Sequence, residues 1–174
     1  MTEPTSPSAS AQPHGSTVQL VQKIMDKKPT LGELLCLTAV PFWFDQDLLA
    51  ALRAKHDGLD DNFWALLQEF SFVQIGHGRC WYNPELRGLL LQQWSSDPQG
   101  LVAAHQRALR YFDQRLVESP PDNSAAHEEL LQARLYHLLA VDEQEGIRFL
   151  LDLFDKAQGE YRLAAAAQYV SVAE

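Results

Sequence analysis

One short interruption in an otherwise helical pattern most constrains the fold of this chain. From residue 18 onward, apolar residues recur every three or four positions, a spacing that predicts amphipathic helices. Residues 71–82 break this period, because SFVQI and RCWY are rich in β-branched and aromatic residues and flank the turn sequence GHG. We therefore expect a mainly α fold that contains one short β-hairpin.

Capping signals place the first helices of the chain. After an amphipathic stretch at residues 18–26, Thr30 followed by Glu33 is typical of a capping box at the start of a helix. Asp45 stands directly before the next apolar run, in the position of an N-cap residue. These signals predict two short helices before residue 58.

The elements around the hairpin predict a winged-helix module over residues 17–96. An apolar stripe at helical spacing covers residues 59–70, directly before the hairpin. Asn83-Pro84 then predicts a closing helix, because proline is favoured at the first helical position. Three helices, a two-stranded hairpin and a closing helix in this order are typical of a winged helix.

Every segment from residue 97 onward is patterned as helix. Asp142 with Glu145 forms a second capping box, and alanine is concentrated in the last helix. Small residues let neighbouring helices pack closely, as stacked helical repeats require. We therefore expect residues 97–174 to form a TPR-like array of helical hairpins. The apolar face of the last helix still continues at Glu174 without a polar capping repeat, which favours a fragment or an abbreviated gene product.

The beginning of the chain has the composition of a disordered tail. Residues 1–16 contain three prolines, six serines and threonines and almost no apolar residue, so they cannot offset the entropy of ordering their backbone. They also lack the basic and apolar regions of a secretion signal. No apolar run in the chain approaches the roughly 20 residues that cross a bilayer. We expect a cytoplasmic protein with no membrane partner.

A spaced set of residues across the third helix, the hairpin and the closing helix suggests a family. The set is Leu67, Phe70, Ser71, Val73, Tyr82, Asn83, Arg87 and Leu90. It resembles the winged-helix module of STAND-type signalling NTPases, the NB-ARC and related class. Residues 97–174 are similar to the helical region that joins such modules to tetratricopeptide-like sensor repeats. The resemblance implies docking, in which the winged helix contacts a nucleotide-binding domain and the repeats contact a sensor ligand or a partner protein.

The chain departs from this family in its nucleotide chemistry. It has no GxxxxGK[ST] phosphate-binding loop and no acidic Mg²⁺ site after a hydrophobic strand. The family often places a phosphate-sensing histidine after the second strand of the wing, where this chain has Asn83-Pro84. No Ser–His–Asp or Cys–His constellation lies within a recognisable motif. We therefore expect no catalytic residues, no cofactor and no enzymatic activity.

The charge of the chain distinguishes between two functions for a winged helix. The formal charge is −9, from 14 Lys and Arg against 23 Asp and Glu, and residues 45–70 alone hold six acids and two bases. A DNA-reading helix needs donors for phosphates and guanine edges, yet residues 60–70 contain no Lys or Arg. The wing supplies only Arg79, with Arg87 behind it. We expect a non-catalytic interaction or regulatory module with a protein partner, and a DNA-binding transcriptional regulator is the alternative.

Large aromatic side chains are the candidates for a partner-facing site. We consider the cluster Phe42, Trp43 and Phe44 together with Trp64, Trp81 and Trp94. Six such residues exceed what a three-helix core easily buries. We expect some of them to pack against the helical region or a partner, and we name Trp43, Trp81 and Trp94 as the candidate partner-facing residues.

The histidines and cysteines do not combine into a metal site. His77 and Cys80 have a metal-like spacing in the hairpin, but a zinc site needs two further ligands and Cys36 is the only other thiol. We interpret both cysteines as buried apolar residues and His77 as a turn residue. The other histidines of the helical region are expected at helix surfaces or boundaries: His105, His127 and His137.

Overall fold

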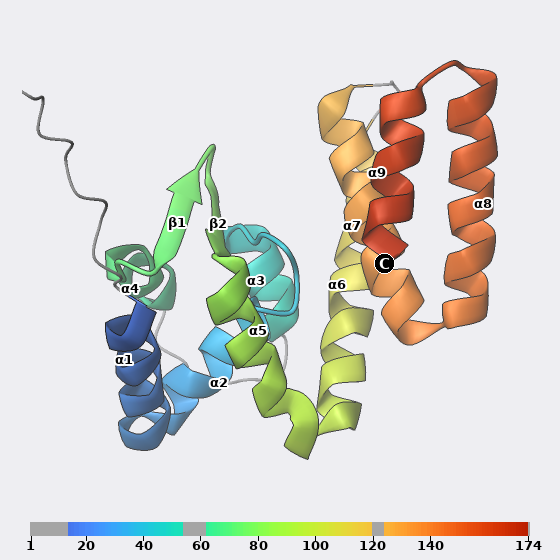
Figure 1. Ribbon diagram of the computed structural model, residues 1–174. Coiled ribbons are helices and arrows are strands. Elements are labelled where there is room, and N and C mark those ends of the chain that lie inside the picture. The colour runs from blue at the N-terminus through green and yellow to red at the C-terminus, as the bar shows by residue number, and fades with distance from the viewer. Residues whose placement is uncertain (1–13, 54–61, 120–123, 174) are drawn as a thin grey trace, which may run out of the picture.

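The structure is a computed structural model, of which residues 14–53, 62–119 and 124–173 are described (Figure 1). The elements in chain order are α1 (His14–Lys27), α2 (Pro29–Thr38), α3 (Gln46–Arg53), α4 (Phe63–Glu69), β1 (Val73–Gly76), β2 (Arg79–Tyr82), α5 (Pro84–Gln92), the 3-10 helix η1 (Gln93–Ser96), α6 (Pro98–Glu118), α7 (Ala125–Val141), α8 (Glu143–Gly159) and α9 (Leu163–Ala173). The expected mainly α fold with one short hairpin is therefore confirmed for these residues. None of their helices is both long and apolar enough to span a bilayer.

The hairpin is closed by a two-residue turn with left-handed backbone. Strands β1 and β2 pair antiparallel from Val73 opposite Tyr82 to Gly76 opposite Arg79. His77 and Gly78 both have positive φ, of 52° and 75°. Such angles match the twist of the flanking strands and favour glycine at the second position. The GHG signal in the sequence thus predicts the turn correctly.

A third segment joins the hairpin, and the sequence pattern does not indicate it. Phe44 lies between α2 and α3, and its N–H donates to the carbonyl of Cys80 at 2.9 Å. The N–H of Cys80 donates in return to the carbonyl of Phe44 at 2.8 Å. This isolated antiparallel bridge fixes the connection from α2 to α3 against β2.

Three helices begin at polar side chains that cap them, as the sequence predicts for Asp45 and Asp142. Asp45, Asn83 and Asp142 each accept a hydrogen bond from the backbone N–H three residues further on, at 2.7, 2.8 and 3.0 Å. Each carboxylate or amide oxygen satisfies a donor that the helix leaves unpaired at its N-terminus. These caps set the starts of α3, α5 and α8.

The capping box predicted at Thr30 and Glu33 is wrong. Helix α2 begins at Pro29, and Lys28 occupies the N-cap position without a side-chain hydrogen bond to the helix end. Proline has a fixed φ and no N–H, so it suits the first helical position well. Thr30 therefore lies inside the helix and does not cap it.

The second half of the chain consists of helices that each run antiparallel to the helix before them, and they stand beside α1 to α5 and the hairpin, which we call the hairpin unit (Figure 1). Helix α7 contacts α6, α8 and α9. A Cβ atom added at Gly146 of α8 would lie only 2.8 Å from the Cα of Leu139 on α7. Glycine at this position therefore permits a close approach of the two helices.

Two clusters of buried apolar side chains form the interior. The first fills the space among α1 to α5 and extends into α6 and the first half of α7. The second consists of Leu135, Leu153, Ala157, Ala166 and Tyr169 on α7, α8 and α9. The first cluster crosses the expected boundary between residues 96 and 97, which lies where η1 ends and α6 begins. Of the expected tail, residues 1–13 lie outside the described residues, and α1 begins at His14.

Candidate functional site

Trp43 lies at the junction between the hairpin unit and the helices that follow it. The guanidinium of Arg79 stands over its ring, 3.8 Å from the centroid. The ring also meets Phe112 of α6 edge to face, with the centroids 5.6 Å apart. Arg79 forms an ion pair with Glu129 of α7 as well. Half-buried Trp43 thus packs against the helical region.

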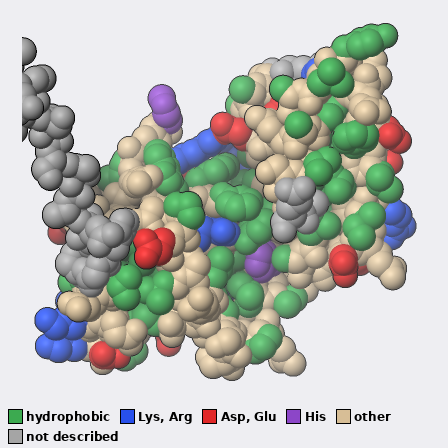
Figure 2. Space-filling view, viewed as in Figure 1, with side chains coloured by type: hydrophobic (Ala, Val, Ile, Leu, Met, Phe, Trp, Pro, Cys, Tyr) green, Lys and Arg blue, Asp and Glu red, His purple; other side chains and the backbone are tan. Residues whose placement is uncertain are grey.

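Arg87 of α5 connects the same two parts of the molecule. Its guanidinium donates to the backbone carbonyls of Val40 at 2.9 Å and Pro41 at 3.3 Å, and to the hydroxyl of Tyr136 on α7 at 2.8 Å. It also lies 4.5 Å from the centre of the Phe42 ring. Figure 2 shows hydrophobic and basic side chains together between the hairpin unit and the long helices. Both arginines near the wing, Arg79 and Arg87, therefore make contacts within the chain.

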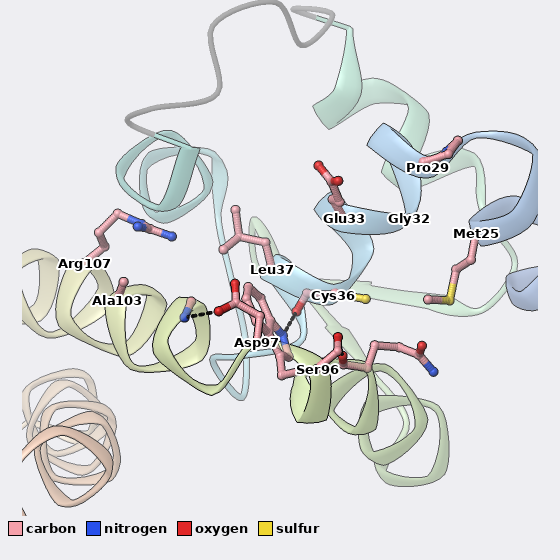
Figure 3. A pocket seen from close by; sticks show the side chains of 13 residues that line it. Met25, Pro29, Gly32, Glu33, Cys36, Leu37, Ser96, Asp97, Ala103 and Arg107 are labelled. Carbon is pink, nitrogen blue, oxygen red and sulfur yellow. Dashed lines mark hydrogen bonds between the residues drawn. The ribbon is translucent and has the colours of Figure 1, made fainter.

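The other two candidate tryptophans are also half-buried and bonded within the chain. Trp81 on β2 donates its indole N–H to Gln74 on β1. Trp94 in η1 donates its indole N–H to the carbonyl of Cys36 at 3.2 Å. Trp94 also lines a cavity between α2 and α6 (Figure 3). The structure therefore does not bring Trp94 together with Trp43 and Trp81 into one aromatic surface.

Two histidines that were expected at helix surfaces or boundaries are buried and paired. His105 on α6 is 5% exposed and His137 on α7 is 1% exposed. Their Nδ1 atoms are 3.0 Å apart, so one ring donates and the other accepts. Burial and the charge of Arg87 lower the pKa of His105 to about 4. Burial, His105 and Arg87 lower the pKa of His137 well below its ordinary value.

Four of the large apolar side chains that are exposed among the described residues lie on the last two helices. They are Ile147 and Leu151 of α8 with Leu163 and Val170 of α9, and we call this set the α8–α9 face. Leu151 is 55% exposed and Leu163 is 67% exposed. Hydrophobic side chains are visible over this part of the molecule in Figure 2. Exposed apolar side chains gathered on neighbouring helices mark a surface that can be covered by a partner.

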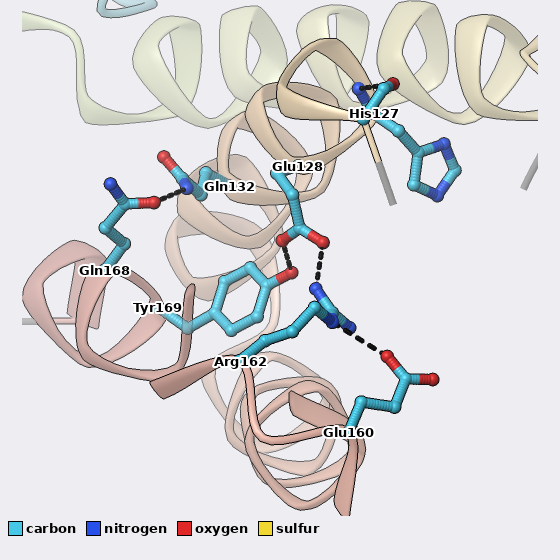
Figure 4. A network of polar contacts seen from close by, with 8 residues as sticks. His127, Glu128, Gln132, Glu160, Arg162, Gln168 and Tyr169 are labelled. Atoms are coloured by element: carbon cyan, nitrogen blue, oxygen red, sulfur yellow. Dashed lines mark hydrogen bonds and ion pairs between the residues drawn. The ribbon is translucent and has the colours of Figure 1, made fainter. Parts of the chain in front are cut away.

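A polar network fixes α9 against α7 behind this face (Figure 4). The carboxylate of Glu128 accepts hydrogen bonds from Arg162 and from the hydroxyl of Tyr169, which is fully buried. The amide of Gln132 donates to the amide oxygen of Gln168 at 2.9 Å. Burial and the hydrogen bond to Glu128 raise the pKa of Tyr169, so its hydroxyl remains a donor at neutral pH. The α8–α9 face is thus presented by a helix pair with a defined geometry.

Acidic side chains accompany the α8–α9 face. Helix α8 carries Glu143, Glu145, Asp152 and Asp155 against Arg148 and Lys156, and all six are exposed. Arg148 is already paired with Glu145 at 2.6 Å. Helix α9 contributes no charged side chain between residues 163 and 173. The charge beside the apolar residues is therefore negative.

The two cysteines and the hairpin histidine differ in their exposure to solvent. Cys36 and Cys80 are buried and unbridged, as expected, whereas His77 is exposed at the hairpin turn. Burial and the charge of Glu33 raise the pKa of Cys36 to about 11, and burial raises the pKa of Cys80, so both thiols are protonated at neutral pH. Among the residues that the structure describes, no group of three or more His, Cys, Asp and Glu side chains could hold a metal ion.

The α8–α9 face offers a chemistry for binding a protein partner. It combines exposed apolar side chains with acidic neighbours, which suits the apolar stripe of an amphipathic helix. Comparison with known proteins adds no relative, since no family model, no curated protein and no solved structure matches this chain.

Proposed function

We propose that this chain is a non-catalytic protein-interaction module, in which a winged-helix unit packs on a TPR-like helical array that docks a helical partner. The observation that carries this proposal is the α8–α9 face, where Leu151 and Leu163 are more than half exposed. Water contact with such side chains is unfavourable, and a partner that covers them gains about 25 cal/mol for each Å² of apolar area removed from water.

The order of elements supports the winged-helix part of the proposal. Helices α2, α3 and α4 precede the hairpin, and α5 follows it. The isolated bridge between Phe44 and Cys80 lies between α2 and α3, the position at which a winged helix has a short additional strand. The antiparallel packing of α6 to α9, with the close approach at Gly146, supports the helical-array part.

The charges on α8 indicate the chemistry of the partner. Four exposed acids against two bases favour a partner with Lys or Arg beside its apolar stripe, because opposite charges at the rim steer association and exclude acidic competitors. The partner segment we propose is an amphipathic helix with basic flanks. The resemblance to STAND proteins suggests that such a helix belongs to a nucleotide-binding domain or to sensor repeats.

Contacts within the chain favour a protein partner over DNA. Helix α4, which precedes the hairpin, has the sequence FWALLQE and carries no basic side chain. Arg79 lies over the Trp43 ring and forms an ion pair with Glu129. Arg87 donates hydrogen bonds to the segment before α3 and to α7. A winged helix that reads DNA needs such side chains free to reach phosphates and base edges.

A selection from displayed helical peptides tests the proposal. We expect wild-type protein to enrich amphipathic helices with Lys or Arg next to the apolar stripe. The selected peptides are then measured by fluorescence anisotropy against the double variant Leu151→Asp/Leu163→Asp. We expect the variant to bind at least about tenfold more weakly, because two carboxylates replace the centre of the apolar contact.

The matched control is Val117→Asp on α6, which changes another strongly exposed apolar residue, 87% exposed, outside the face. This variant should bind the selected peptides like wild type. Circular dichroism establishes that all variants remain helical. Enrichment of peptides without helical periodicity, or equal affinity for wild type and the double variant, would refute the α8–α9 face as the docking site.

A further inference from the structure

An open cavity of about 650 Å³ lies between α2 and the start of α6 and is also lined by the end of α1 and by η1 (Figure 3). Its volume lies within the range of small-molecule sites, roughly 300–1,000 Å³. It is separate from the α8–α9 face, because none of the residues that line it belongs to α8 or α9.

Much of the cavity wall is apolar. Met25, Pro29, Leu37 and the Trp94 ring all contribute to it. Cys36 also lines the wall, and its thiol is protonated at neutral pH because its pKa is raised to about 11. The wall therefore suits a flat or chain-like apolar body and offers no thiolate for covalent chemistry.

Arg107 of α6 supplies a cationic group that is unpaired. Its Nε atom is buried without a hydrogen-bond partner, and no ion pair of Arg107 exists among the described residues. A buried donor without an acceptor is unfavourable, and more so when it is charged. Burial and the neighbouring charge of Arg110 also lower the pKa of Arg107, as expected for a cation without a counter-ion. An anionic ligand group would relieve both penalties.

The charged group and the apolar wall lie at different ends of the cavity. In Figure 3, Arg107 is at one end, Met25 is at the other, and Leu37 and Cys36 lie between them. Of the two carboxylates nearby, Asp97 accepts a hydrogen bond from the Gly100 N–H at the start of α6, at 2.9 Å. The helix N-terminus therefore compensates the charge of Asp97.

We infer that this cavity binds a small amphipathic organic anion, with its acidic group at Arg107 and its apolar body against Leu37 and Trp94. Glu33 is exposed at the rim of the cavity, and its negative charge disfavours a second acidic group on the part of the ligand next to it. The ligand class is therefore a monoanion, such as an aromatic or aliphatic carboxylate. The site is independent of the proposed docking function, and either can fail without the other.

Two fluorescent dyes of similar shape and different charge test this inference. Anilinonaphthalene sulfonate carries one anionic group, and N-phenylnaphthylamine is its uncharged counterpart. We expect wild-type protein to bind the anionic dye at least about tenfold more tightly than the neutral dye, by fluorescence titration. The variant Arg107→Gln should lose this preference and bind both dyes alike. The variant Ala103→Trp, which fills the cavity with an indole, should weaken binding of both dyes.

The matched control is Arg110→Gln, which removes the same charge from an exposed position on the same helix. It should keep the preference of wild type. In NMR spectra, the anionic dye should shift the indole N–H signal of Trp94 and leave that of Trp81 in place. The inference is overturned if Arg107→Gln retains the preference, if Ala103→Trp binds both dyes like wild type, or if the Trp94 signal does not move.

Discussion

Lowering the pH from about 7 to about 5 is expected to remove about 2 kcal/mol of folding free energy through His105, and His137 adds to this loss because its pKa is lowered in the same direction. Both rings are neutral in the fold, because burial and Arg87 hold their pKa values below the ordinary value near 6.5. In the unfolded chain they bind protons as the pH falls below 6.5. The stability that neutral histidines confer is therefore present above pH 6.5 and is lost progressively as the pH falls through about 4.

The geometry of the pair adds a second reason for this acid sensitivity. The two Nδ1 atoms are 3.0 Å apart, and a proton on the accepting ring would place two N–H groups against each other. Denaturant unfolding at both pH values measures the effect, and His77→Asn on the exposed hairpin turn is the control that should keep the wild-type pH dependence. NMR should show two histidine rings that stay neutral over this range. If every histidine titrates between these pH values, the buried pair does not exist in solution.

Replacing Arg87 with alanine is expected to lower the free energy of unfolding by about 3 kcal/mol. The change leaves the carbonyls of Val40 and Pro41 and the hydroxyl of Tyr136 without their charged donor. It also removes the cation from the ring of Phe42. Arg87→Lys should lose less, because it keeps the charge but cannot hold several acceptors with a planar fork. Denaturant titration followed by circular dichroism measures each loss.

A second arginine provides the comparison for Arg87→Ala. Arg148 is exposed on α8, and within the described part of the chain its only ion pair is with Glu145, at i and i+3 on the same helix. Arg148→Ala should change the stability by no more than about 0.5 kcal/mol. A double-mutant cycle of Arg87→Ala with Tyr136→Phe should give a coupling energy of about 1 kcal/mol across the junction. Equal effects of Arg87→Ala and Arg148→Ala would show that Arg87 does not connect the two parts.

Local signals in the sequence predict most of the helices and the hairpin. Asp45 and Asp142 cap where expected, and Asn83 caps the helix whose start Pro84 predicts, because an N-cap acts on a backbone N–H only three residues away. The prediction fails at Thr30, where two start signals lie side by side and Pro29 takes the first helical position. The Phe44–Cys80 bridge joins residues 36 positions apart, so no local pattern contains it.

The buried histidine pair shows what sequence reasoning misses and which signal was present. His105 falls on the apolar stripe of α6, four residues after Leu101, three before Ala108 and seven before Phe112. That phase predicts burial, although histidine is polar. Its partner His137 is 32 positions away on another helix. Their contact depends on how α6 packs on α7, which no spacing in the sequence determines.

The sequence predicts only part of the candidate site. Trp43, Trp81 and Trp94 stand out by composition, and the structure gives each of them a partner within the chain. The α8–α9 face is different, because Leu151 and Leu163 belong to helices whose apolar residues exceed one buried stripe. Which of these residues remain uncovered depends on how α9 lies against α7. The network around Glu128 fixes that placement through contacts that are distant in sequence.

Affinity capture from extracts of the native cell tests the central claim, that the α8–α9 face docks a protein. Wild type, Leu151→Asp/Leu163→Asp and Val117→Asp are compared by quantitative mass spectrometry, with cross-linking to locate the contact. We predict a protein that is retained by wild type and Val117→Asp, lost from the double variant, and cross-linked through a basic amphipathic helix to α8 or α9. The same proteins on all three baits, or retention of duplex DNA at physiological salt by wild type, would contradict the claim.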